Sequence, residues 1–120
     1  MANPIGQAPV PLVLGGNVFG WTADAAASFA VLDRFVEGGG TLIDTADMYS
    51  SWVAGHTGGE SERMIGAWLK RGVPRGAVTI ATKVGLLPGR GGAGLAPARI
   101  AAACDESLER LGVEAIDLYF

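Results

Sequence analysis

The chain has 120 residues and a formal net charge of −3, and 49% of its residues are hydrophobic while only 18% are charged. Charged residues make up about a quarter of a typical soluble domain, so part of this chain's surface is expected to be covered by further structure. The length suits one small domain or a piece of a larger one, and an acidic chain without a basic patch is not expected to bind nucleic acid.

The sequence also indicates the cellular compartment. Residues 1–7 contain no basic residue and no apolar stretch of the kind that begins a signal peptide, and no apolar run approaches the length of a membrane span. Cys104 is the single cysteine, so an internal disulfide is impossible and a reducing compartment is favoured. We therefore expect a cytoplasmic protein that does not contact a membrane.

Strand-like and helix-like segments alternate along the chain. Short apolar or β-branched runs predict strands, and longer segments with apolar residues at helical spacing predict helices. In chain order we expect a strand at 10–14, a helix at 25–37, a strand at 41–44, a helix at 60–70, a strand at 78–83, a helix at 97–111 and a strand at 115–120.

Capping residues mark the ends of the predicted helices. Thr22 or Asp24 begins the first helix and Gly38 ends it. Pro97 suits the first position of the third helix, and Gly112 ends that helix. The apolar face of the third helix is expected to carry Ile100, Cys104, Leu108 and Leu111.

The alternation predicts an α/β fold with a parallel sheet built from right-handed βαβ units. A complete (β/α)8 TIM barrel needs ~250 residues, so this chain supplies about three βα units and a fourth strand. Because a chain rarely stops inside a buried parallel strand, we expect residues 1–120 to be one partial barrel domain, truncated at the end of its fourth strand.

Three polar residues lie where functional groups gather in such a barrel, at the C-terminal ends of the strands. Asp44 closes the second strand, Tyr49 follows in its loop, and Lys83 closes the third strand. A phenol beside an ammonium group can donate a proton to a carbonyl oxygen, and a carboxylate can hold the ammonium in place. Taken singly, the three residues would more often be a loop start, a packing residue and a solvated strand end.

Longer motifs surround these three residues. They are LGGNVFGW at 14–21, GGG at 38–40, IDTADMY at 43–49, GESERMIG at 59–66, ATK at 81–83, SLERL at 107–111 and IDLY at 116–119. In this order they closely resemble the N-terminal part of the aldo-keto reductases. The resemblance implies a (β/α)8 barrel and an oxidoreductase that uses NADP(H) to reduce an aldehyde or ketone to an alcohol.

The resemblance also implies roles for individual residues. It places Asp44, Tyr49 and Lys83 at three of the family's four catalytic positions, with Tyr49 as the proton donor tuned by the other two. The fourth position is a histidine, expected two residues beyond Phe120 and therefore outside this chain. Most of the family's cofactor-binding loops also follow later, so the substrate and the preference for NADP over NAD are not specified here.

The cofactor and substrate contacts that remain come from the first two loops. Gly20 and Trp21 match family positions that approach the nicotinamide and the substrate, and Asp44 is counted with the cofactor site. A small carbonyl compound is the expected partner, in a pocket formed by Trp21, Tyr49 and Trp52. For Trp52, packing within its own loop is an equal alternative.

Three other features suggest chemistry that we do not expect. The run GRGGAG at 89–94 fits G-x-G-x-x-G, but other residues separate it from the strand before and the helix after, so a flexible loop or lid is favoured over a Rossmann phosphate site. His56 is predicted to be a loop residue at the pocket rim, and Cys104 a packing residue. One histidine and one cysteine do not supply a zinc site, and no metal is expected.

A second hypothesis is a non-catalytic half-barrel, which is either a truncated product or a module that works by associating with another chain. Four strands cut from a barrel have two open sheet edges, and open edges with exposed apolar surface drive association. The isolated 120 residues are therefore expected to self-associate and to be inactive. Their exposed inner face is predicted to carry Leu42, Ile80 and Leu118.

Overall fold

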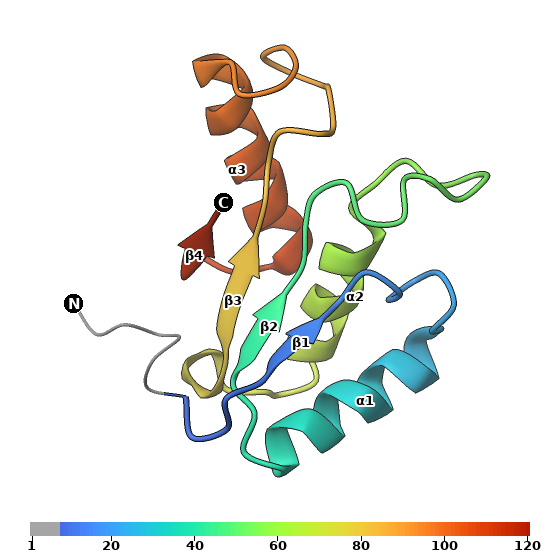
Figure 1. Ribbon diagram of the computed structural model, residues 1–120, viewed down its shortest axis with the longest axis vertical. Helices are drawn as coiled ribbons and strands as arrows, with labels where there is room; N and C mark the ends of the chain where they lie inside the picture. Colours follow the sequence, from blue (N-terminus) through green and yellow to red (C-terminus); the bar gives the residue numbers. More distant parts are fainter. Residues whose placement is uncertain (1–7) are drawn as a thin grey trace.

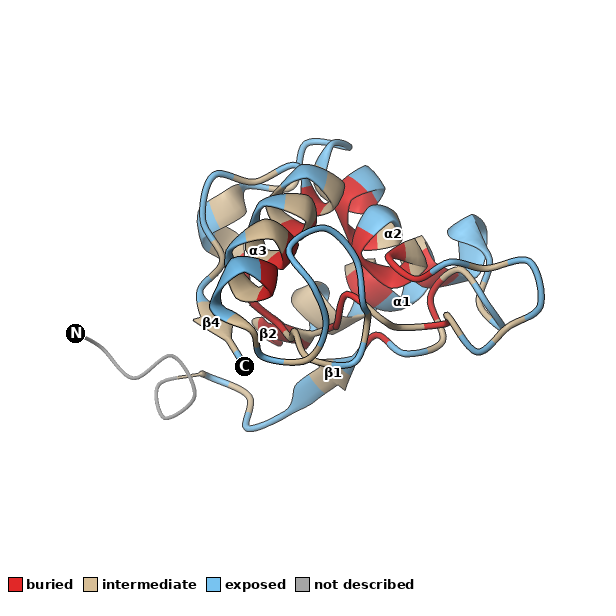
Figure 2. Cartoon of the chain, turned by 90° about the horizontal axis from the view of Figure 1, so that it is seen from above, coloured by how far each residue is buried: buried red, intermediate tan, exposed pale blue. Residues whose placement is uncertain are grey.

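The computed structural model describes residues 8–120, so residues 1–7, where no signal peptide is expected, lie outside the described part. Four strands form one parallel sheet in the order β1-β2-β3-β4, and three helices lie along one side of it (Figures 1 and 2). The strands are β1 (Val13–Gly15), β2 (Leu42–Asp44), β3 (Thr79–Thr82) and β4 (Leu118–Tyr119). The helices are α1 (Ala25–Glu37), α2 (Glu60–Leu69), α3 (Pro97–Leu111) and a 3-10 turn, η1 (Arg75–Ala77).

The helices begin and end for local reasons. Asp24 is the N-cap of α1, and its carboxylate accepts a hydrogen bond from the Ala27 N–H at 2.9 Å. The C-cap of α3 is Gly112, which adopts the left-handed conformation (φ 66°); its N–H bonds back to the last turn of the helix. The predicted bounds of α1 and α3 are confirmed, and α2 ends one residue earlier than expected.

The two edge strands are shorter than the sequence predicted. β1 begins only at Val13, because Pro11 has no N–H for a sheet ladder and the Leu12 N–H instead bonds to the Val10 carbonyl. Before β4, the Asp117 carboxylate accepts hydrogen bonds from the Ile80 N–H and from Arg75, so this stretch is held partly by side-chain contacts. Strand length therefore depends on partners distant in sequence.

The core lies between the sheet and the helices. Its buried members are Phe19, Leu32, Ile43, Ile65, Trp68, Val78, Ile80 and Leu111. The backbones of α2 and α3 come very close at Gly66, where an added Cβ would overlap the Arg110 carbonyl. That glycine therefore sets how closely the two helices approach.

The prediction of an exposed inner face was partly wrong. Ile80 pairs with Ile43 in register, and both are buried in the core on the helix side. Leu42 points the other way but is also buried, since its registered neighbours Val13 and Thr79 flank it on both sides. Leu118 is half-buried.

Other apolar residues are exposed instead. Val13 on β1 is 54% exposed, and Phe120, which follows β4, is 62% exposed. These two residues lie at the opposite edges of the sheet, where residues 8–120 form no further strand. The predicted exposure is therefore found at the edges rather than at the sheet centre.

The buried face of α3 also differs from the prediction. The fully buried residues are Arg99, Ala103, Ser107 and Leu111, whereas Ile100, Cys104 and Leu108 are half-buried. The polar residues of this stripe are hydrogen-bonded: Arg99 donates to the Leu87 carbonyl and to Glu106, and the Ser107 hydroxyl accepts from Arg110. Of the helices formed by residues 8–120, none combines the length and apolar character needed to cross a membrane.

Candidate active site

The side chains of Asp44, Tyr49 and Lys83 meet at the C-terminal edge of the sheet. Lys83 Nζ donates hydrogen bonds to Asp44 Oδ2 at 2.8 Å, to the Thr45 carbonyl at 2.8 Å and to the Tyr49 hydroxyl at 3.0 Å. An ammonium group has three donors, so all three are used. The lysine is thereby held in one position between a carboxylate and a phenol.

The surroundings of Lys83 favour its charged form. Burial alone would lower the pKa of this ammonium group, but the hydrogen bonds to Asp44 and Tyr49 and the attraction of those groups outweigh it, so the pKa is raised. A charged lysine has no acceptor atom, so it donates to the Tyr49 oxygen and does not accept from it. The phenolic proton of Tyr49 is consequently left for another acceptor.

The loop after β2 positions Tyr49. The Thr45 N–H bonds to the Ala81 carbonyl and the Asp47 N–H to the Lys83 carbonyl, so the loop continues alongside the β3 chain past the end of β2. Ser50, next to Tyr49, is fully buried with a positive φ of 62°, and its hydroxyl lies 3.2 Å from His56 Nδ1. These contacts fix the backbone on both sides of the tyrosine.

Two tryptophans form an aromatic wall beside the tyrosine. The Trp52 ring contacts Tyr49 edge-on, with centroids 6.2 Å apart, and Trp21 contacts Trp52 edge-on at 5.6 Å. Trp21 is 45% exposed and Trp52 is 47% exposed. The structure therefore brings together the three residues assigned to the substrate pocket, and leaves much of both indole rings open to a ligand.

Gly20 has a different environment from its neighbour Trp21. Its φ is +81°, which favours glycine, and an added Cβ would lie 3.2 Å from Glu60 Cβ at the start of α2. Gly20 also lines a small apolar groove between α1 and α2. The close approach to α2 is a structural reason for glycine that is separate from the expected cofactor contact.

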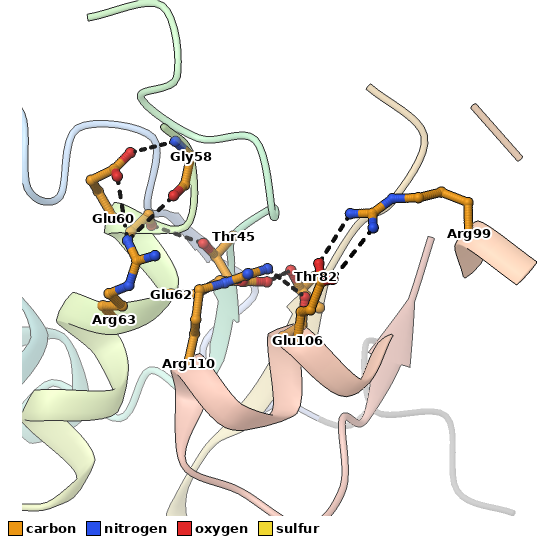
Figure 3. A network of polar contacts seen from close by, with 11 residues as sticks. Thr45, Gly58, Glu60, Glu62, Arg63, Thr82, Arg99, Glu106 and Arg110 are labelled. Atoms are coloured by element: carbon orange, nitrogen blue, oxygen red, sulfur yellow. Dashed lines mark hydrogen bonds and ion pairs between the residues drawn. The ribbon is translucent and has the colours of Figure 1, made fainter. Parts of the chain in front are cut away.

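A buried polar network lies behind the site, and sequence reasoning missed it. Glu62 is fully buried; it accepts hydrogen bonds from the Thr82 hydroxyl at 2.6 Å and from Arg110 Nε at 2.6 Å (Figure 3). Arg99, also buried, pairs with Glu106 at 3.1 Å. The only available signal was that Glu62 and Arg110 fall inside motifs that resemble the family.

Asp47 lies beside this network and is 1% exposed. Burial raises the pKa of its carboxyl to about 6, and the charge of Glu62 adds to this, while Arg110, Arg99 and the Met48 N–H act in the opposite direction. Within residues 8–120, its Oδ2 atom and the Tyr119 hydroxyl are buried side-chain atoms without a hydrogen-bond partner. Asp47 is thus the least satisfied carboxylate near the site.

The remaining sequence features lie outside this cluster. His56 contacts Ser50 and lies 3.9 Å from Glu60, and neither contact involves Tyr49. In the loop at 89–94, Gly89 and Gly92 bond to each other through their backbones, and the loop packs on Arg99 rather than opening a helix. Cys104 is half-buried on α3.

Comparison with known proteins shows where this arrangement belongs. The profile of the Aldo/keto reductase family matches residues 11–120. This chain is a member of the aldo/keto reductase family. Its fold is the first part of the family's (β/α)8 barrel, and membership places it among oxidoreductases, in a family that typically uses a nicotinamide cofactor.

The chain is also similar in sequence to individual curated proteins. An uncharacterized 11.2 kDa protein of Pseudescherichia vulneris is 53% identical over 76 residues, which are 62% of this chain and 74% of that protein. Aldo-keto reductase str7 of Strobilurus tenacellus is 41% identical over 92 residues, which cover 77% of this chain and 24% of the reductase.

A solved structure extends the comparison to three dimensions. The crystal structure of PA4992, the putative aldo-keto reductase from Pseudomonas aeruginosa, matches this chain with a TM-score of 0.76 at 30% identity. The match covers 98% of this chain but 45% of that chain. This chain therefore spans about a quarter of the length of the Strobilurus reductase and less than half of the length of the solved protein.

Proposed function

We propose that residues 1–120 are the first half of an NADP(H)-dependent carbonyl reductase in which Tyr49 is the proton donor. The observation that carries this proposal is the three-way hydrogen bonding of Lys83, which joins Asp44 and Tyr49 at the edge where barrel enzymes have their active sites. The family membership supports the reaction class, and the choice of NADP(H) rests on the family resemblance.

Tyr49 has the geometry of a general acid. Its oxygen accepts a hydrogen bond from Lys83, and its own proton is free to point toward a carbonyl oxygen. As negative charge develops on that oxygen, the proton passes from the phenol, and the positive charge of Lys83 stabilises the phenolate left behind. Asp44 keeps the lysine charged and in place, so each of the three residues has a separate task.

The aromatic wall fits a planar cofactor ring. Flat, half-exposed indole surfaces such as those of Trp21 and Trp52 suit stacking or edge contacts with a nicotinamide. Gly20, Trp21 and Asp44 are the residues that we propose to lie against it. A reduced nicotinamide would supply the hydride that reaches the carbonyl carbon, while the chain supplies the proton for the oxygen.

A second candidate function is a half-barrel that works by associating with another chain. Its support is the exposure of Val13 and Phe120 at the two edges of the sheet, together with a relative of only 11.2 kDa. Association of two half-barrels would cover both edges.

A direct assay separates the two candidates. The complete barrel that begins with this chain should oxidise NADPH in the presence of an aldehyde or ketone and form one alcohol for each NADPH consumed. The assay is repeated with NADH to test the cofactor preference. Absence of alcohol with a broad panel of carbonyl compounds would contradict the reductase and favour the association module.

A further inference from the structure

The first turn of α2 contacts the ends of two strands from the side opposite the candidate site. Ser61 Oγ donates a hydrogen bond to the Gly16 carbonyl at 2.6 Å, directly after β1. The same oxygen lies 2.8 Å from Thr45 Oγ1, directly after β2. Ser61 and Thr45 are both fully buried, so water does not compete for these bonds.

The next residue, Glu62, holds the end of β3. Its Oε1 atom accepts from the Thr82 hydroxyl and its Oε2 atom from Arg110 of α3, each at 2.6 Å (Figure 3). Gly59 makes room for this arginine, because an added Cβ there would lie 2.5 Å from Arg110 Cδ. Both carboxylate oxygens of Glu62 are therefore occupied, one by a strand end and one by a neighbouring helix.

These contacts reach the residues next to the reactive side chains. Thr45 directly follows Asp44, and Thr82 directly precedes Lys83. Successive side chains of an extended chain point to opposite faces, so each threonine turns toward the helices where its neighbour turns toward the site. The two consecutive residues of α2 thus hold the two backbone segments from which the Asp44–Lys83 pair projects.

We propose that Ser61 and Glu62 are positioning residues that set the separation of Asp44 and Lys83, and through Lys83 the place of the Tyr49 hydroxyl. The proposal rests on the proposed reductase function. A contribution to stability alone explains the buried Glu62–Arg110 ion pair poorly. Burying a carboxylate and a guanidinium is costly, and apolar side chains of similar size often give the same stability. Hydrogen bonds with fixed geometry explain why charged groups occupy this place.

The test removes one hydroxyl without changing the shape of the side chain. In the complete barrel, Thr82→Val should lower kcat roughly ten- to a hundredfold with little change in KM, since small displacements of reacting groups cost about this much. The pKa of Lys83 should also fall, because its contact with Asp44 loosens. This pKa is measured by NMR of the side-chain nitrogen, whose signal is assigned by comparison with Lys83→Met. Thr82→Ser keeps the hydroxyl and should restore both values.

Ser28→Ala is the matched control. Ser28 is equally buried, and its hydroxyl bonds to the Ala23 carbonyl in the loop before α1, away from the ends of β2 and β3 that carry Asp44 and Lys83. This variant should leave the Lys83 pKa unchanged, even if its melting temperature falls, because the loop that it loosens does not contact Lys83 or Asp44. If the Lys83 pKa falls equally in Thr82→Val and Ser28→Ala, the Thr82–Glu62 bond is only structural and the proposal is overturned.

The two readouts separate this proposal from the proposed function. An unchanged Lys83 pKa in Thr82→Val overturns the positioning role whatever the activity is. If the wild-type barrel reduces no carbonyl compound, the reductase assignment fails, while a fall in the Lys83 pKa in Thr82→Val still supports the coupling between Glu62 and the Asp44–Lys83 pair.

Discussion

Replacing Asp47 with asparagine should stabilise the protein at neutral pH. Asp47 is 1% exposed, its Oδ2 atom has no hydrogen-bond partner within residues 8–120, and burial followed by the charge of Glu62 raises its pKa from 3.8 to about 6. Arg110 and Arg99 compensate only in part. Asparagine has the shape of the protonated acid without the charge that must otherwise be buried.

The sign and size of the effect follow from proton linkage. Because the pKa of Asp47 is higher in the folded state, the folded protein binds more protons than the unfolded chain between about pH 4 and pH 6. Its contribution to stability is therefore present below this window and is lost as the pH rises through it. A shift of about two units corresponds to about 3 kcal/mol, so Asp47→Asn should raise the free energy of unfolding at pH 7 by up to this amount.

Urea unfolding of the complete barrel at several values between pH 4 and pH 7 measures this difference. The gain of Asp47→Asn over wild type should be near zero at pH 4 and grow toward pH 7. Asp105→Asn, at an exposed position on α3, is the control and should show no such growth. An Asp47→Asn variant that is equally or less stable than wild type at pH 7 would refute the reasoning.

Three further predictions concern packing, the lysine and the isolated chain. Gly66→Ala should lower the free energy of unfolding by about 1–3 kcal/mol, because the added Cβ forces α2 away from the Arg110 carbonyl. The control Gly76→Ala places its Cβ in open space and should be nearly neutral in a thermal melt. Equal melting temperatures of the two variants would show that the helices adjust freely. Lys83→Met should lower kcat by ~10² and change its pH profile, and an unchanged profile would argue for a solvated strand end. The isolated 120 residues should scatter light as oligomers and fail to consume NADPH, so a compact monomer or measurable turnover would contradict this.

Much of the fold could be predicted because its signals are local. Asp24, Pro97 and Gly112 mark helix ends through their own backbone preferences, and the predicted bounds of α1 and α3 agree with the structure. Strand lengths and exposure could not be read in this way. Leu42 lies in register with Val13 and Thr79, and the sequence does not specify this register. The stretch before β4 is held by a contact between Arg75 and Asp117, which are 42 residues apart.

The candidate site shows the same division between local and distant signals. Asp44 and Lys83 could be placed at one edge because each ends a recognisable strand of a parallel sheet. The support behind them could not be predicted, because Glu62 and Arg110 are 48 residues apart and glutamate on a helix is ordinarily exposed. Only the packing of α2 between the sheet and α3 makes this carboxylate a buried hydrogen-bond acceptor.

The most direct test of the central claim is the Tyr49→Phe variant of the complete barrel. This change removes the hydroxyl that accepts a hydrogen bond from Lys83 and keeps the ring that contacts Trp52. NADPH-dependent carbonyl reduction should fall by ~10² or more, because proton donation contributes ~10²–10⁴, while NADPH binding measured by fluorescence titration stays at the wild-type level. Reduction within a few fold of wild type would contradict the assignment of Tyr49 as the proton donor.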